Sequence, residues 1–204
     1  MRDSLFDALD GMEMGKSEHD WLEQRFGSMT TKERLLFQGA MQLEHPQTVK
    51  ETLRLLNGLD HYRLLYGADD DVSLGRFVME CIHIPTHAAR GYLDPEIVGA
   101  AYRESGSGCF LENHYVERIY PNRPLPELEP DAVLPATGDY AIRVKLASRS
   151  NLEGVWVGFP DTGEYMDAAH PDELLLGLDA LNAETLEQCI AVDVDCALPQ
   201  LTNI

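Results

Sequence analysis

His83 and His87 are the residues whose type and spacing most directly suggest chemistry. Two histidines four positions apart on a helix present both imidazoles on one face, where they can bind zinc, and Glu80 and Cys81 supply further donor atoms. Pro85 lies between them, however, and breaks the helical register that would align the imidazoles. No glutamate stands inside the pair to act as the base of a metalloprotease. The sequence therefore favours histidines of a loop or of the core and predicts no metal site.

A second stretch, Gly11–Ser17 (GMEMGKS), has the composition of a phosphate-binding loop. Three residues separate its glycines, whereas the phosphate-loop motif has four, and no strand is expected before it. The backbone amides that cradle a phosphate depend on that loop length and on a strand-to-helix connection. We therefore expect no nucleotide site, and no other cofactor is implied.

Covalent catalysis has no recognisable signature in this chain. No serine can be assigned to a nucleophile elbow, and neither cysteine nor histidine falls into a known local pattern. With 35 acidic residues, some carboxylates will be close by chance, so a general acid and base cannot be singled out. The four cysteines are widely spaced and lack a C-x-x-C pair, which predicts reduced thiols. An enzyme is therefore the least favoured hypothesis.

The first 120 residues carry mostly helical signals, beginning with short amphipathic segments around residues 5–9 and 21–26. Capping boxes at Thr30–Glu33 and Thr48–Glu51 place a hydroxyl and a carboxylate where the free amides of a helix start need acceptors. The Asn57-Gly58 pair predicts a left-handed helix end. The expected elements are helices at about 31–44, 48–57 and 72–81, a strand His61–Tyr66, a helix begun by Asp94 and Pro95, and a strand within Cys109–Ile119.

A proline-rich stretch divides the chain. Five of the eleven prolines lie between Pro121 and Pro135, where missing amide donors disfavour both helix and central strand. We therefore expect a helical segment at 1–28, an α+β region at 29–120, a linker at 121–139 and an acidic module at 140–204. The predicted fold class is α+β, with a mostly helical N-terminal region followed by a small β-β-α-β module.

The C-terminal module has the clearest pattern. Apolar and polar residues alternate along 142–146 and again along 155–159, which predicts a β-hairpin around the segment SRSNLEG. A helix from about Pro171 has leucines at helical spacing, so its acids Asp172, Glu173 and Asp179 are expected to face water.

A last strand, Ile190–Cys196, closes the module. Strict alternation would put Ile190, Val192, Val194 and Cys196 on one face and Asp193 with Asp195 on the other. Every acid of the module would then lie on an outer surface.

From Ser150 onward the sequence has no Lys or Arg. A folded surface normally mixes charges, because uncompensated like charges destabilise the compact state. Two interpretations compete: a generally acidic protein, or a surface that binds something positive, such as the DNA-binding groove of another protein. The candidate partner-binding residues are the eleven carboxylates of this stretch: Glu153, Asp161, Glu164, Asp167, Asp172, Glu173, Asp179, Glu184, Glu187, Asp193 and Asp195.

The whole chain is acidic, with 35 acidic against 16 basic residues, a net charge of -19 and a pI near 4.5. Direct binding to nucleic acid or to an anionic membrane is therefore not expected. The N-terminus lacks a signal-peptide pattern and no apolar stretch approaches the roughly 20 residues of a membrane span, so we expect a cytoplasmic protein.

Closely spaced carboxylates can imitate DNA, which presents one charge per about 1.7 Å of its axis. Same-face strand residues such as Asp193 and Asp195 lie about 6.5–7 Å apart by the rise per residue. An i, i+3 pair such as Glu184 and Glu187 would lie about 5–6 Å apart on a helix. These spacings suit a phosphate row, and they suit any solvated acidic face equally well.

The C-terminal module has, in order, a strand (YAIRVKL), an Asn-containing loop, a Gly-x-Trp strand, an acidic helix and a final strand IAVDVDC. With this order and with Asn151, Gly154, Trp156, Asp193 and Asp195 as the matching residues, it resembles the first domain of ArdA-type antirestriction proteins. Residues 29–118 are also similar to antirestriction proteins of conjugative elements in gut Firmicutes, through LGRF (74–77), the 84–85 step, YLDPE (92–96) with Gly99, and GCFLENHYV (108–116).

This resemblance implies a DNA-mimicking inhibitor of type I restriction-modification enzymes, encoded on mobile DNA. The expected partner is the basic DNA-binding groove of a restriction-modification complex, and a homodimer is left open. The alternatives are a mobile-element accessory protein that binds another protein partner, and an enzyme with an unrecognised cleft.

Overall fold

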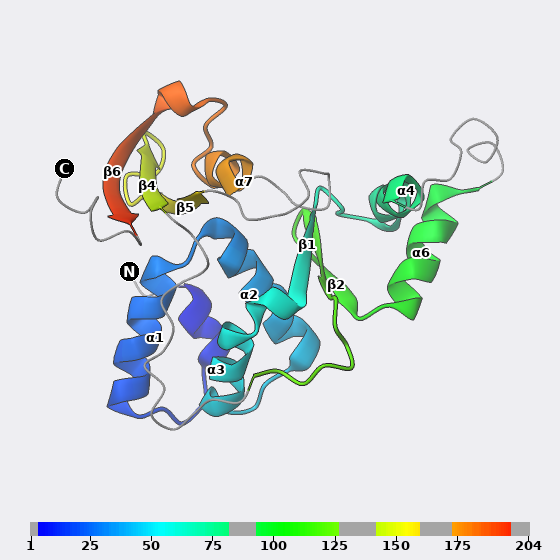
Figure 1. The fold of residues 1–204 in the computed structure, drawn as a ribbon, viewed down its shortest axis with the longest axis horizontal. Coiled ribbons are helices and arrows are strands. Elements are labelled where there is room, and N and C mark those ends of the chain that lie inside the picture. The colour runs from blue at the N-terminus through cyan, green and yellow to red at the C-terminus, as the bar shows by residue number, and fades with distance from the viewer. Residues whose placement is uncertain (1–3, 82–92, 127–141, 160–172, 197–204) are drawn as a thin grey trace. The chain divides into compact units, whose positions relative to one another are not determined.

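The structure is a computed structural model that describes residues 4–81, 93–126, 142–159 and 173–196 (Figure 1). It is an α+β fold, as the sequence predicted, and it divides into two compact units. Of the described residues, the terminal unit comprises 4–34, 142–159 and 173–196, and the central unit comprises 35–81 and 93–126. Residues up to 34 thus group with the acidic module. The two units are therefore divided at other positions than the predicted segments 1–28, 29–120, 121–139 and 140–204.

The terminal unit combines two N-terminal helical segments with a β-β-α-β module. In chain order its elements are η1 (Ser4–Leu9), α1 (Lys16–Ser28), β4 (Ile142–Ser148), β5 (Val155–Phe159), α7 (Glu173–Ala180), η3 (Leu186–Gln188) and β6 (Cys189–Cys196). A 3-10 helix rather than a strand precedes Gly11–Ser17, so this stretch lacks the setting of a phosphate loop.

The central unit is helical around a second small sheet. Its elements are most of α2 (Thr31–Glu44), then α3 (Val49–Asn57), η2 (Leu59–His61), β1 (Tyr62–Tyr66), α4 (Asp71–Cys81), α6 (Pro95–Ser105), β2 (Gly108–Leu111) and β3 (His114–Arg118). No helix in the described parts of the chain is long and apolar enough to cross a membrane.

The sheet of the terminal unit has the order β5-β4-β6, with both neighbours antiparallel to β4. Val144 of β4 lies opposite Val157 of β5, as expected for the predicted hairpin. The alternating apolar face carries the core, in which Leu146 and Val157 pack with Leu178 and Leu181 from α7 and the turn after it. Helix α7 lies beside β5, and β6 forms the other side of the sheet (Figure 1).

Strand β6 does not alternate strictly. The register with β4 shifts between Lys145 and Leu146, which leaves Val192 as the extra residue of a β-bulge. Ile190 therefore lies on the opposite face of the sheet from Val194. The prediction that all apolar residues of this strand share one face is wrong, because a bulge inverts the alternation and nothing in the local sequence marks it.

The sheet of the central unit has the order β1-β3-β2 and is antiparallel throughout. The single strand predicted within Cys109–Ile119 is a hairpin, β2 and β3, whose turn contains Glu112 at a φ of 50°. Tyr115 and Val116 on β3 are fully buried. Helix α2 approaches the sheet at Gly39, where a Cβ atom would lie 2.5 Å from the side chain of Val116, so only glycine permits this packing.

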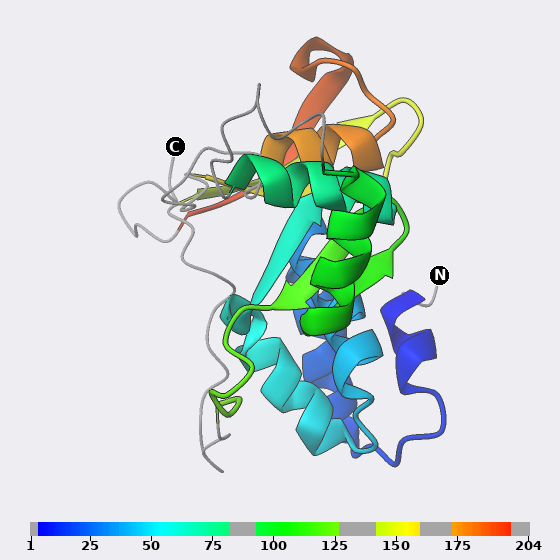
Figure 2. The same ribbon diagram turned by 90° about the vertical axis from the view of Figure 1, so that its right-hand side faces the viewer.

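Helices α4 and α6 lie side by side (Figure 2) and touch through their backbones. A Cβ at Gly75 would lie 1.8 Å from the carbonyl oxygen of Pro95, and one at Gly99 would lie 1.8 Å from that of Asp71. The guanidinium of Arg103 also donates to both carboxylate oxygens of Asp71, at 2.8 and 3.0 Å. The motifs LGRF and Gly99 therefore supply the two glycines of one helix contact.

Of the two predicted capping boxes, one is complete and the other keeps only its threonine cap. The Glu33 amide donates to Thr30 Oγ1 and the Thr30 amide donates to Glu33 Oε2, which completes the first capping box. In the second, the Glu51 amide donates to Thr48 Oγ1, but the Glu51 carboxylate accepts from the Gln47 amide instead of closing the box.

The end of α3 departs from its predicted geometry. Gly58 has a φ of -114°, so it is not the left-handed residue that Asn57-Gly58 indicated. A Cβ there would lie 2.8 Å from the Leu125 side chain and 3.0 Å from Pro126, so close packing explains the glycine.

Two predicted features lie outside the described residues. One is the histidine pair His83 and His87, and the other is most of the proline-rich linker, from residue 127. Whether that linker joins independently folding parts stays a prediction.

Replacing Gly99 by Ala should destabilise the protein by about 3 kcal/mol or more, because the added methyl group meets a backbone carbonyl that cannot rotate away. Gly27→Ala is the matched control, since that helical glycine is exposed and has nothing within 4 Å of its Cβ position. It should leave stability unchanged or raise it by about 0.5–1 kcal/mol. Urea unfolding of the two variants and the parent measures both effects, and equal midpoints would contradict the backbone contact.

Candidate functional site

The structure describes seven of the eleven candidate carboxylates. Asp161, Glu164, Asp167 and Asp172 lie outside the described residues. Six of the seven are exposed, as predicted: Glu153, Asp179, Glu184, Glu187, Asp193 and Asp195. The seventh, Glu173, is buried.

The exposed acids come from different kinds of local structure. Glu153 lies in the turn between β4 and β5. Glu184 precedes η3 and Glu187 lies in it, so the two are not an i, i+3 pair on an α-helix. The Glu184 amide donates to Gln188 Oε1 at 3.0 Å, which holds this turn together. The regular helical spacing considered for these two acids is therefore not present.

The two acids of β6 face a basic row on β4. Asp195 lies opposite Arg143 and Asp193 lies opposite Lys145 in the strand register. Arg143 forms an ion pair with Asp195, and its guanidinium lies 5.1 Å from the centre of the Trp156 ring. The β6 carboxylates are exposed but their charge is partly compensated within the sheet.

Glu173 was expected to face water, and this expectation is wrong. Its side chain is only 1% exposed, and its Oε1 accepts a hydrogen bond of 3.1 Å from Thr30 Oγ1. Helical spacing alone placed Glu173 on the outer face of α7, because periodicity does not show that the Thr30 hydroxyl lies there. A buried carboxylate needs such a partner to offset its lost hydration.

Glu173 belongs to a polar cluster that joins α7 to the junction of α1 and α2. Thr30 also caps α2 through the Glu33 amide, and Glu33 accepts from Arg25 Nη2 at 2.8 Å. The capping box was visible in the sequence. Nothing in the sequence indicated that its threonine would also donate to a residue 143 positions away.

The same junction contacts the sheet at β5. Thr30 forms a parallel bridge with Trp156, and Arg143 Nη1 donates to the carbonyl oxygen of Ser28 at 2.7 Å. Arg143 thus has three neighbours, namely Asp195, the Trp156 ring and the Ser28 carbonyl. Arg143 therefore stabilises the packing of this unit and is not an isolated charge on its surface.

The central unit holds a buried polar cluster that could be taken for catalytic residues. Glu117 Oε1 accepts from Arg63 Nε at 2.8 Å, and its Oε2 accepts from the Tyr102 hydroxyl at 2.8 Å. Burial, with a smaller contribution from Glu117, raises the pKa of Tyr102 to about 12. Both oxygens of Glu117 are engaged and its side chain is buried, so this cluster stabilises the β1-β3 pair rather than forming a general acid or base open to a substrate.

A pocket of about 340 Å³ opens in the central unit between α3 and the segment after β3. Glu44, Glu51, Arg54, Arg118 and Leu125 are among its lining residues. Glu44 already accepts from Arg118 Nη1 at 2.8 Å and from the Tyr62 hydroxyl at 2.9 Å. Because the pocket mixes both signs of charge and its Glu44 carboxylate is engaged, we assign it no chemistry.

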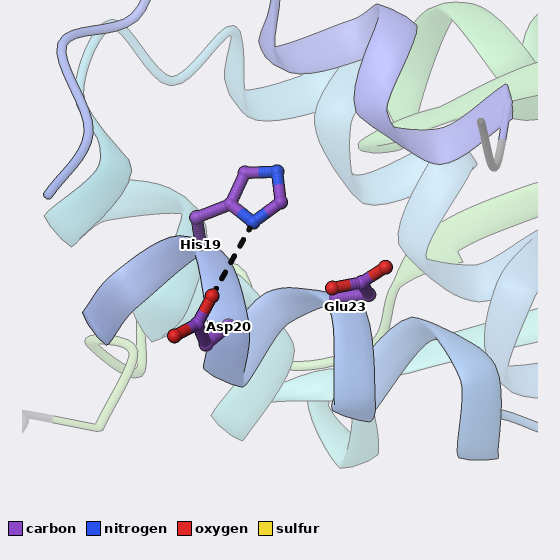
Figure 3. A group of neighbouring side chains, drawn as sticks. All are labelled: His19, Asp20 and Glu23. Atoms are coloured by element: carbon purple, nitrogen blue, oxygen red, sulfur yellow. Dashed lines mark ion pairs between the residues drawn. The ribbon is translucent and has the colours of Figure 1, made fainter. Parts of the chain in front are cut away.

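Figure 3 shows a group that could offer ligands to a metal ion, His19, Asp20 and Glu23 on α1. Their donor atoms lie within 4.8 Å of one another, and the His19 ring stacks on Phe6 at 5.1 Å between centroids. All three side chains are exposed. Exposed acids and histidines often gather on helices without an ion, so we assign no metal here.

Comparison with known proteins identifies no relative. No protein-family model matches the chain, and no curated protein or solved structure matches it significantly. What this chain does must therefore be inferred from its own residues.

Removing the buried carboxylate should cost stability. Glu173→Ala should lower the free energy of unfolding by about 2 kcal/mol, because the Thr30 hydroxyl would lose its buried acceptor and the carboxylate would leave a cavity. Glu187→Ala, which removes the same side chain from an exposed position, should change it by less than about 0.5 kcal/mol. Chemical denaturation compares the two, and equal losses would mean that Glu173 is not buried in solution.

Two tyrosines predict loss of stability at alkaline pH. Burial raises the pKa of Tyr102 and of Tyr115 from 10.0 to about 12. The unfolded chain ionises these phenols first, so the stability they contribute is full below pH 10 and is lost as the pH rises from 10 to 12. Denaturation midpoints measured across this range should fall less steeply in Tyr102→Phe than in the parent. Equal slopes would show that Tyr102 titrates normally.

Proposed function

We propose that this protein is a non-enzymatic, acidic protein-binding module that occupies the basic DNA-binding groove of a type I restriction-modification complex. It would act as a DNA mimic, as the resemblance to ArdA-type antirestriction proteins implies. The observation that carries the proposal is the exposure of six carboxylates in a stretch that has no Lys or Arg from Ser150 onward.

The exposed acids differ in how much charge they can offer a partner. Asp193 and Asp195 face Lys145 and Arg143, so part of their field is cancelled within the sheet. Glu153, Glu184 and Glu187 lie in turns and in a short 3-10 helix, outside the paired rows of β4 and β6. We therefore assign these three glutamates the larger share of the attraction to a basic groove.

Two of the residues that carry the family resemblance, Asn151 and Gly154, lie in the turn before β5. Asn151 Oδ1 accepts from the Gly154 amide at 3.1 Å, and Gly154 has a φ of 74°, which favours glycine. A Cβ at this glycine would lie 2.6 Å from the Leu146 carbonyl oxygen. Asn151 and Gly154 thus have a structural role in this turn, and the proposed inhibitory activity rests on the charge alone.

The test neutralises these three glutamates and the exposed Asp179 together. A variant with Glu153→Gln, Asp179→Asn, Glu184→Gln and Glu187→Gln should bind a type I methyltransferase-specificity complex at least tenfold more weakly, because each lost charge weakens the attraction to Lys and Arg in the groove. Binding by the parent should fall steeply with salt and be competed by duplex DNA, since charge contacts are screened over about 10 Å at 0.1 M ionic strength.

The control variant carries the same change of charge at other exposed positions: Asp10→Asn, Glu13→Gln, Glu104→Gln and Glu112→Gln. If binding depends on where the carboxylates lie, the control should bind like the parent. Equal loss in both variants would indicate net charge alone. Binding that resists salt and duplex DNA would exclude DNA mimicry.

A further inference from the structure

Strand β6 is a long, apolar strand at the edge of its sheet. It spans Cys189–Cys196 and pairs with β4 on one side, and no strand of the described chain pairs with its other side. Ile190 is 64% exposed, Val192 49% and Val194 57%. An edge strand of this length and composition offers a row of amides and carbonyls to another strand.

The devices that usually protect an edge strand are only partly present here, since β6 has two aspartates and a bulge. β6 contains no Lys and no Pro, which are the residues that most often prevent pairing at an edge. It does contain the bulge at Val192 near the middle of the strand, and the Val194 amide donates to Asp193 Oδ1 at 2.8 Å. Helix α7 packs against β5, so the described helix of this module does not cover the apolar residues of β6.

The two faces of β6 differ in what they would present to an added strand. Val194 lies on the face of Val144, whereas Asp193 and Asp195 lie on the face of Lys145 and Arg143. The Asp195 side chain is 53% exposed although it pairs with Arg143, and a carboxylate can accept from two cations at once. A basic residue on an added strand would therefore lie beside these acids on the side away from β4. The sheet would then carry a basic row on β4, an acidic row on β6 and a second basic row on the added strand.

We propose that β6 is a docking edge for an extended segment of a partner protein in which Lys or Arg alternate with β-branched apolar residues. The segment would add a strand to the sheet, with its cations beside Asp193 and Asp195 and its apolar side chains beside Val194. This inference rests on the proposed function, because both require a basic protein partner, and it assigns the way in which that partner is held.

A second copy of this chain does not fit the edge. Each chain carries a net charge of -19, and pairing of two β6 strands would bring Asp193 and Asp195 of each copy toward those of the other. The charge of the surface selects a basic strand instead.

The probe is the capped heptapeptide Lys-Val-Lys-Val-Lys-Val-Lys. Hydrogen exchange should show that it protects amides of β6 and leaves those of β5 unchanged. Two further peptides carry N-methyl groups either on the lysines or on the valines, which removes the amide donors along one edge of the strand or along the other. At least one of them should bind at least tenfold more weakly, because strand addition needs one edge. Equal binding by all three peptides would reveal mere charge attraction and overturn the proposal.

A protein variant tests the same edge from the other side. Val192→Thr with Val194→Thr keeps the strand preference but makes the edge polar, and should weaken peptide binding at least threefold. Leu152→Thr with Leu175→Thr changes two other exposed apolar residues and should have no effect. If the β6 variant binds the peptide like the parent, β6 is not the docking edge.

The same variants separate this inference from the proposed function. A β6 variant that loses neither peptide nor methyltransferase complex, while the four-acid variant loses the complex, would overturn the docking edge and leave DNA mimicry standing. Peptide binding at β6 by a protein that does not bind the complex would contradict the proposed function and support the edge.

Discussion

The terminal unit depends on one buried hydrogen bond, from the Thr30 hydroxyl to the Glu173 carboxylate. Thr30 caps the start of helix α2 and also forms a bridge to Trp156 on β5, while Glu173 is the first residue of helix α7. The bond therefore links the start of α2 to the start of α7, beside strand β5. A carboxylate is costly to bury without a donor, and the donor is fixed by the capping box. The first residues of the chain and the acidic module therefore share one compact unit although more than 100 residues separate them.

The acidic character of the chain is distributed unevenly once the strands are paired. β4 supplies a basic row and β6 an acidic row, and the two lie side by side in register. A count of charges along the sequence treats Asp193 and Asp195 like Glu153. The cations that face these aspartates, Arg143 and Lys145, precede Ser150 and are therefore not part of the stretch that lacks Lys and Arg. Pairing between distant strands thus decides which carboxylates can attract a partner from a distance and which mainly stabilise the sheet.

Local signals predicted what local forces determine. The capping box at Thr30, the side-chain caps at Thr48 and Asp94, and the alternation in β4 and β5 depend on residues a few positions apart, and the structure has each of them. Sequence reasoning failed where a distant segment decides the outcome. The burial of Glu173 depends on Thr30, and the bulge in β6 depends on its pairing with β4. The Cys109–Ile119 run was predicted as one strand because apolar and aromatic residues lie on both sides of Glu112 and Asn113, and these two polar residues form the turn between β2 and β3.

The contact between α4 and α6 restricts how these two helices of the central unit can move relative to each other. Each helix contains a single glycine, Gly75 in one and Gly99 in the other, and each backbone fills the space that a side chain would need. Sliding one helix along the other by a residue would place a Cβ atom against a carbonyl oxygen, so no neighbouring register is accessible. Helices that meet through flexible side chains can slip or tilt by small steps, whereas this pair is either docked in one register or separated, and intermediate arrangements are excluded by hard contact.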